Sequence, residues 1–125
     1  MTYGVGVVGT VRATHVMAGM PLPEGAPHEH DYRIEVSVER PSLDDEGMVV
    51  DIDVLRRSLA DVSDRMTGAD LGDVLETDEA VTVERLSQWL HARLSEGVGA
   101  LPQAEMTVTV WEGPDAFGAY QDVVG

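Results

Sequence analysis

The sequence predicts an α+β fold in which two helices cover one face of an antiparallel sheet. Apolar and polar residues alternate near both ends of the chain, over residues 31–39 and again over residues 105–112. Between them the apolar spacing changes to about 3.6 residues, the period of a helix. Strands at the ends with helices grouped in the middle are typical of α+β proteins. At 125 residues, we expect one domain, residues 1–125.

The first two strands are predicted over residues 3–15 and 31–39, with a loop rich in proline and glycine between them. The apolar residues of the second strand all share one parity: Tyr32, Ile34, Val36 and Val38. His28 and His30 extend that parity toward the loop, and His15 ends the first strand on its own apolar parity. Antiparallel pairing across the loop puts the end of one strand beside the start of the next. We therefore expect the three histidines to lie together.

A short third strand is predicted at residues 47–52, immediately before the helical period begins. The first helix starts near Asp51 or Asp53, because either side chain can cap it. Its apolar stripe consists of Leu55, Leu59, Val62 and Met66. A short helical turn is expected over residues 70–75.

The second long helix is predicted to begin after Thr82, a suitable N-cap residue, and to end at Gly97 or Gly99. Two strands follow it, one over residues 105–112 and an edge strand over residues 119–124. The predicted order is thus three strands, two helices and two strands.

The composition excludes several classes of function. With 23 acidic residues and 8 basic ones, all arginine, the net charge is −15, which opposes binding to nucleic acid or to anionic membranes. The absence of cysteine excludes disulfides, thiolate metal sites and a thiol nucleophile. No apolar run approaches the roughly 18 residues of a membrane span, and no basic leader precedes one, so we expect a cytoplasmic protein.

The histidine cluster has the composition of a metal site. An H-x-H pair on a strand puts both imidazoles on one face, about 6.5–7 Å apart along the chain. With His15 added, three imidazoles and an open fourth position match a catalytic zinc site, although iron, nickel and copper also accept imidazole. The alternative is that His28 and His30 are ordinary strand-edge residues hydrogen-bonded to Glu29 or Asp31.

Five segments form an ordered series of motifs. They are A-T-H at 13–15, H-E-H-D-Y-R-I-E-V at 28–36, G-M-V-V-D at 47–51, T-V-E-R-L at 82–86 and V-W-E at 110–112. In order and spacing the series resembles the A-A-H, H-G-H-N-Y-x-V-x-V, G-M-V-x-D-F, P-T-x-E-x-L and V-x-E-T motifs of the 6-pyruvoyl-tetrahydropterin synthase / 6-carboxy-tetrahydropterin synthase family. The resemblance extends from His15 to Tyr120.

This resemblance implies a T-fold subunit, with a four-stranded antiparallel sheet and two helices on one face. Such subunits assemble through trimers into a barrel, so a homo-oligomer, commonly a hexamer, is expected. The resemblance also implies that His15, His28 and His30 hold zinc, which polarises the side-chain oxygens of a pterin. Thr82 and Glu112 correspond to substrate-binding positions, and the Glu112 carboxylate would accept two hydrogen bonds from the pterin ring. The alternative for Glu112 is a solvated strand end.

Two positions depart from the family. The proton-transferring cysteine, four residues before H-x-H, is replaced by Glu24, which could act as a general base if burial raised its pKa. A subset of the family with glutamate here cleaves dihydroneopterin triphosphate to 6-hydroxymethyl-dihydropterin. The L-D-H motif aligns with residues 69–71, which retains Asp70 as a catalytic candidate but replaces the histidine by Leu71. His91, the remaining histidine, is expected at the surface.

Three functions remain open from the sequence. The leading hypothesis is a zinc-dependent lyase acting on the side chain of a 7,8-dihydropterin such as dihydroneopterin triphosphate. A member of the family that binds zinc and pterin without catalysis is the second, and a metal-dependent hydrolase that uses Glu24 is the third. Binding of a triphosphate is in doubt, because Arg12 and Arg33 have the parity opposite to the histidines.

Overall fold

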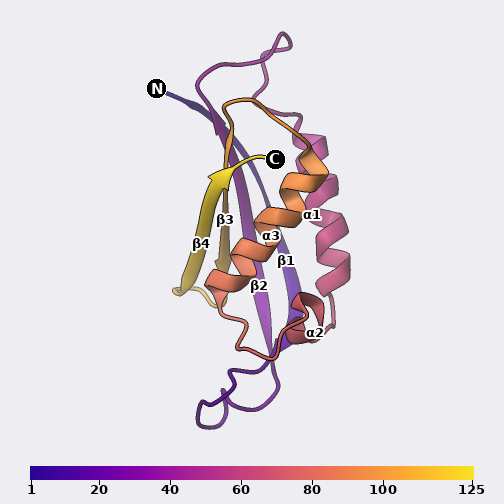
Figure 1. Cartoon of the computed structure of the whole chain (residues 1–125), viewed down its shortest axis with the longest axis vertical. Helices are drawn as coiled ribbons and strands as arrows, with labels where there is room; N and C mark the ends of the chain where they lie inside the picture. Colours follow the sequence, from indigo (N-terminus) through magenta and orange to yellow (C-terminus); the bar gives the residue numbers. More distant parts are fainter.

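The computed structural model describes residues 1–125, and its strands form one sheet with helices on one side (Figure 1). In chain order the elements are β1 (Tyr3–His15), β2 (His28–Arg40), α1 (Ile52–Met66), α2 (Leu71–Leu75), α3 (Val83–Val98), β3 (Glu105–Trp111) and β4 (Phe117–Val123). The strands lie in the order β1-β2-β3-β4, and each neighbouring pair is antiparallel. The predicted α+β class and the predicted helices are confirmed.

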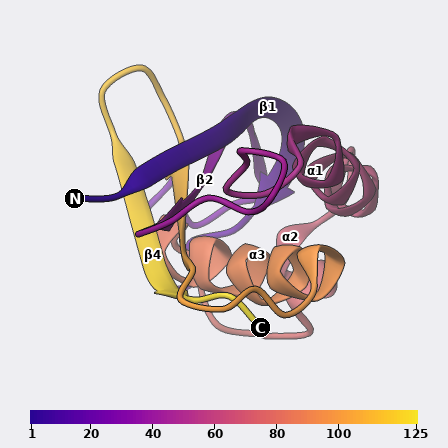
Figure 2. The same cartoon turned by 90° about the horizontal axis from the view of Figure 1, so that it is seen from above.

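The sheet curves around the two long helices, and the core lies between the sheet and these helices (Figure 2). Alternate residues of β2 and β3 point inward and are fully buried, including Ile34 and Val108. They pack with the apolar stripes of α1 and α3, of which Leu55 and Leu90 are also fully buried. Because the pleat has a period of two, the same parity that fills the core carries the histidines onto the inner face.

Each helix begins at a side-chain cap. Asp51 accepts a hydrogen bond from the backbone nitrogen of Asp53, Asp70 from that of Asp73, and Thr82 from that of Arg85. These bonds satisfy amide groups that have no partner inside the helix. Helix α3 ends at Gly99, whose φ of 82° favours glycine.

The predicted strand at residues 47–52 is wrong. This segment is irregular: Asp44 Oδ1 accepts hydrogen bonds from the backbone of Glu46 and Met48, and Gly47 has a φ of 78°. Arg40 then donates to the Val49 carbonyl at 3.1 Å. The sheet consists of β1, β2, β3 and β4, and the segment pairs with none of them. Of its apolar residues, Val49 is buried in the core without being part of a strand.

The expectation of a surface position for His91 is also wrong. Its side chain is buried between α3 and β4, where Nε2 donates to the Asp122 carbonyl at 3.1 Å and the ring meets Tyr120 edge-on at 5.1 Å. The buried arc of α3 is therefore wider than its apolar stripe and includes Ser87 and Ser95. None of the helices is both long enough and apolar enough to span a membrane.

Candidate metal and substrate site

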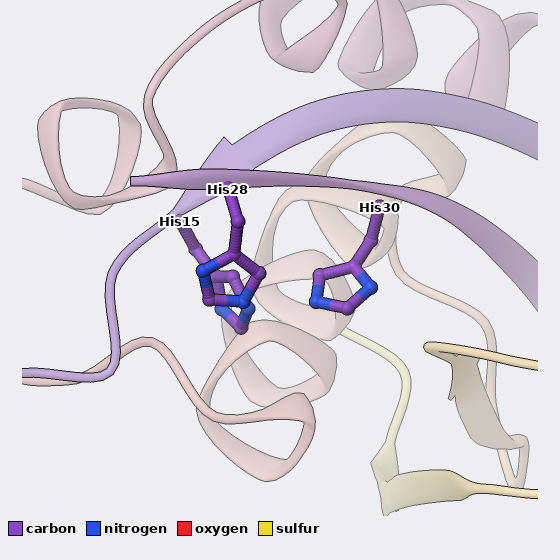
Figure 3. Close-up of side chains that lie close together, drawn as sticks. All are labelled: His15, His28 and His30. Atoms are coloured by element: carbon purple, nitrogen blue, oxygen red, sulfur yellow. The ribbon is translucent and has the colours of Figure 1, made fainter. Parts of the chain in front are cut away.

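Three histidines converge at the end of the β1–β2 hairpin. His15 lies directly opposite His28 in the register, and Ala13 lies opposite His30, as the parity argument predicted. Their ligand nitrogens all lie within 4.8 Å of one another. Figure 3 shows the three rings projecting to the same side of the two strands. The spacing is suited to three ligands of one metal ion.

Backbone hydrogen bonds fix the orientation of two of the rings. His15 Nδ1 lies 3.1 Å from the Val81 carbonyl, and His28 Nδ1 lies 2.8 Å from the Ala26 carbonyl. A carbonyl only accepts, so each Nδ1 carries the proton and each Nε2 keeps its lone pair. His15 Nε2 is buried without a hydrogen-bond partner. A backbone carbonyl that holds one ring nitrogen while the other nitrogen stays unpartnered is typical of metal-binding histidines, and the residues therefore fit a zinc ion.

The charge state of His15 also suits a ligand. Burial lowers the pKa of His15, and the neighbouring charges of His28 and His30 lower it further, against the opposing effect of the hydrogen bond that His15 donates to the Val81 carbonyl. A lowered pKa favours the neutral imidazole, which is the form that binds a metal.

The alternative interpretation, in which acids beside the H-x-H pair hold the histidines, does not match the structure. Glu29 and Asp31 have the opposite parity and point away from the rings. Both bind Arg12, through Nε to Glu29 Oε2 at 2.7 Å and through Nη1 to Asp31 Oδ1 at 3.0 Å. The histidines of β2 are thus free of carboxylate partners from their own strand.

A cavity of about 550 Å³ lies beside the histidines. Of the predicted substrate-binding and proton-transfer residues, Glu24, Thr82 and Glu112 line it and Asp70 does not. The full lining consists of Met17, Met20, Pro23, Glu24, His28, His30, Thr82, Val83, Glu84 and Glu112. The β1–β2 loop, the start of α3 and the end of β3 therefore meet around one space. The loop is held by a hydrogen bond from Met17 nitrogen to the Glu24 carbonyl at 2.8 Å.

Glu112 enters the cavity because it continues the inward parity of β3. It follows Trp111, which pairs with Arg33, and its backbone nitrogen donates to the Ala116 carbonyl at 3.0 Å. Its carboxylate is close enough to the cluster to add to the raising of the Tyr32 pKa, of which burial is the larger cause, and to oppose slightly the lowering of the His15 pKa by burial. The side chain is half-buried, which is inconsistent with a fully solvated strand end.

Glu24 and Asp70 differ from what a buried proton relay requires. Glu24 lines the cavity but is exposed in the single chain. Asp70 lies outside the cavity lining, where it caps α2 and forms a bridge with Thr14, the neighbour of His15. Leu71 is fully buried in the core. The structure therefore brings Glu24, but not Asp70, to the metal ligands.

Three further residues of the site were missed in the sequence. The hydroxyl of Tyr32 is buried without a partner, and its ring lies 6.0 Å from that of His15 and 5.6 Å from that of His30. Its parity next to the H-x-H pair could have indicated this. Met20 and Glu84 join the cavity only through the packing of a loop and a helix end, for which no spacing rule exists.

Comparisons with known proteins agree with the fold. The sequence matches the model of the 6-pyruvoyl tetrahydropterin synthase family over residues 7–122. The structure is similar to that of 6-pyruvoyl tetrahydropterin synthase from Caenorhabditis elegans, with a TM-score of 0.79 at 18% identity over 98% of this chain and 96% of that one. The Plasmodium falciparum enzyme gives a TM-score of 0.80 at 13% identity, covering 98% and 99% of the two chains.

A protein of uncharacterized function from Wolinella succinogenes is also similar, with a TM-score of 0.77 at 13% identity over 98% of this chain and 99% of that one. No curated protein shows significant sequence similarity to the chain. At these identities the structural matches establish the T-fold, and the family match covers more than nine-tenths of the chain. The chain belongs to the 6-pyruvoyl tetrahydropterin synthase family.

Proposed function

We propose that the protein is a zinc-dependent enzyme of the lyase type that acts on the side chain of a 7,8-dihydropterin. The observation that carries the proposal is the convergence of three imidazoles, one of which, His15, has a buried, unpartnered Nε2. The other two line a cavity together with Glu24 and Glu112. Metal ligands, a candidate base and a candidate ring anchor thus share one space.

Zinc bound by His15, His28 and His30 would supply Lewis-acid polarisation of the substrate's side-chain hydroxyl oxygens. The protein's part is to hold the ligands neutral and oriented, through the Val81 and Ala26 carbonyls. Tyr32, whose pKa is raised chiefly by burial, stays protonated and neutral beside the ligands.

Glu112 is proposed to bind the pterin ring. A carboxylate accepts two parallel hydrogen bonds from an exocyclic amine and the adjacent ring NH, a charge-assisted arrangement with strong geometric preference. Thr82 lines the same cavity from the start of α3, where its Oγ1 already accepts from the Arg85 nitrogen at 3.1 Å. Its hydroxyl proton remains available to a ligand.

Glu24 is proposed as the general base that removes a proton from a side-chain carbon. It lines the cavity on the loop that precedes His28. A Plasmodium vivax 6-pyruvoyltetrahydropterin synthase has a glutamate as a catalytic residue, since variants replacing that glutamate by cysteine and by alanine have been solved. Because Glu24 is exposed in the single chain, the burial a base requires has to come from the ligand or a neighbouring subunit.

Asp70 is proposed to position rather than to transfer protons. It pairs with Thr14, next to His15, and it caps α2. These contacts keep the end of β1 against the α1–α2 connection.

We also propose that the chain forms a homo-oligomer built from trimers, and a hexamer is the first assembly to test for. Both β1 and β4 are edge strands of an open sheet, with 13 and 7 residues. Long open edges are available for strand pairing, and pairing between copies would close the sheets into a barrel. Analytical ultracentrifugation of the purified protein tests the assembly.

The experiment for the function starts from protein purified without added metal. Elemental analysis should find about one zinc per subunit, and incubation with 7,8-dihydroneopterin and with its triphosphate, followed by chromatography, should yield a new pterin from one of them. The product should be lost in Glu24→Gln. Protein without zinc would contradict the site, and zinc without any product would contradict the lyase.

A second candidate is a family member that binds zinc and pterin without turnover. It is favoured by the buried Leu71 at the position aligned with the catalytic histidine. It predicts pterin binding that Glu24→Gln leaves unchanged and no product from either substrate.

A further inference from the structure

We infer that the cavity selects a dihydropterin with an uncharged polyol side chain and rejects its triphosphate ester. This inference rests on the proposed function, because it concerns the substrate of that same site. It follows from the charges around the cavity, from the position and pairing of every arginine, and from what another copy of the chain could add.

The cavity is lined by acids and by no base. Glu24, Glu84 and Glu112 contribute three carboxylates, and neither arginine nor the amino terminus is among the lining residues. A zinc ion on the neutral histidines would add two positive charges, which the three carboxylates outweigh. A ligand entering the cavity therefore meets a negative field.

Two arginines lie on a groove beside the cavity, on the outer side of the sheet. Arg12 and Arg33 line it together with Glu29, Asp31 and Glu112, so the acids outnumber the bases there as well. Arg12 is bound to both Glu29 and Asp31, and Arg33 Nη2 lies 3.1 Å from Glu35 Oε1. A phosphate that bound these guanidinium groups would break their ion pairs. The released carboxylates would then lie unpaired beside the negative charge of the phosphate.

A second copy of the chain cannot easily supply the missing bases. The chain has eight basic side chains, and those that pair with carboxylates are Arg12, Arg33, Arg56, Arg85 and Arg93. Arg40 donates to backbone carbonyls, and Arg65 lies over the Trp89 ring at 5.2 Å. Of the eight arginines, Arg57 on α1 is the one whose side chain has no carboxylate, carbonyl or aromatic partner, so a second copy has a single unengaged arginine to contribute.

The triphosphate and polyol side chains of the two candidate substrates interact very differently with this negative field. A triphosphate carries several negative charges at neutral pH and has only acceptor oxygens to offer. Moved into a cavity lined by carboxylates, it loses hydration and gains repulsion. A polyol offers hydroxyl donors, which carboxylates such as Glu24 and Glu84 can accept. The same lining therefore favours one substrate and opposes the other.

The test is calorimetric titration of the zinc-loaded protein with 7,8-dihydroneopterin and with 7,8-dihydroneopterin triphosphate, at low and at physiological salt. We expect the triphosphate to bind at least about tenfold more weakly at low salt, and the difference to shrink as salt screens the repulsion. Equal or tighter binding of the triphosphate, weakening as salt rises, would overturn the inference while leaving the proposed function intact. Failure of both ligands to bind a zinc-loaded protein would overturn the proposed function and this inference with it.

A pair of variants isolates the charge. Glu84→Gln removes one cavity carboxylate and keeps the Thr82 cap, so it should narrow the affinity difference between the two ligands severalfold. Asp45→Asn removes the same charge from the turn that follows β2, beyond the opposite end of that strand from His28, and should leave the difference unchanged. Equal effects of the two variants would show that net charge, rather than the cavity, discriminates, and would overturn the inference. Circular dichroism checks that both variants are folded.

Discussion

His15 and His28 face each other across the last pair of the β1–β2 ladder, with ring centroids 4.5 Å apart. Each donates its Nδ1 proton to a backbone carbonyl outside the pair, so both direct Nε2 toward the same point. Two rings held in this way offer two of the three ligands of the proposed metal site, and His30 offers the third from one pleat further along β2.

Removing His30 should release the metal without unfolding the chain. His30 is half-buried and has no hydrogen bond that supports the fold, so we expect His30→Ala to lower zinc affinity by more than about a hundredfold, since loss of an outer-shell partner alone costs up to that much. Competition with a zinc-binding dye measures the affinity. Glu29→Gln, the neighbour on the opposite face, is the control that should bind zinc as the parent does. A His30→Ala protein with parental affinity would contradict the three-histidine site.

The cap of α3 should contribute measurably to stability. Thr82→Ala removes the oxygen that accepts from the Arg85 nitrogen, and we expect the free energy of unfolding to fall by about 0.5–2 kcal/mol. Thr82→Ser keeps that oxygen and should stay near the parent. Urea denaturation followed by circular dichroism measures both, and an equal loss in the two variants would show that the methyl group, not the cap, matters.

Close packing between β4 and α3 should make Gly118 sensitive to a single methyl group. A Cβ at Gly118 would lie 2.7 Å from Val83 Cγ2 and 3.3 Å from the Glu84 nitrogen. We expect Gly118→Ala to lower the free energy of unfolding by about 1–3 kcal/mol through overpacking. Gly113→Ala, where a Cβ meets no atom within 4 Å, is the matched control. Val83→Ala in the Gly118→Ala background should recover part of the loss, and no recovery would indicate strain elsewhere.

The carboxyl of Asp122 should titrate below its ordinary range. Its pKa is lowered by the hydrogen bond from the Val123 nitrogen and, next, by that from the Tyr120 hydroxyl. Because the pKa is depressed in the folded state, this group stabilises the fold above its unfolded value of about 3.9, and that contribution is lost as the pH falls through the folded pKa. Carboxyl chemical shifts measured by NMR should show Tyr120→Phe moving the pKa upward, toward but not reaching the ordinary value. An unchanged pKa would show that the Tyr120 bond is absent in solution.

The histidine cluster could be predicted because it depends only on local rules. Parity along β1 and β2 fixes the face, and antiparallel pairing across one loop fixes the neighbours, so His15 was expected beside His28. The helix starts at Asp51 and Thr82 followed in the same way from capping chemistry. Such rules involve residues close together in the chain.

The predictions that were wrong concern features that depend on contacts between elements far apart in the chain. Residues 47–52 form a short apolar run, and a run of that length does not distinguish a strand from a buried irregular segment. The apolar stripe of the helix alone predicts a surface position for His91, whereas in the structure β4 supplies a carbonyl partner for its Nε2. The edge strand begins at Phe117 rather than near Ala119 because pairing with Trp111 extends it.

The hydrogen bond from His15 to the Val81 carbonyl connects the histidine cluster directly to the start of α3. Val81 is covalently joined to Thr82, so the His15 ring is anchored to the peptide that opens α3 and borders the cavity. The carbonyl that holds the ring and the residue that lines the cavity are therefore neighbours in the chain. We expect an ion that fixes the His15 ring to order the start of α3 as well, and so to tighten the binding of a ligand in the cavity.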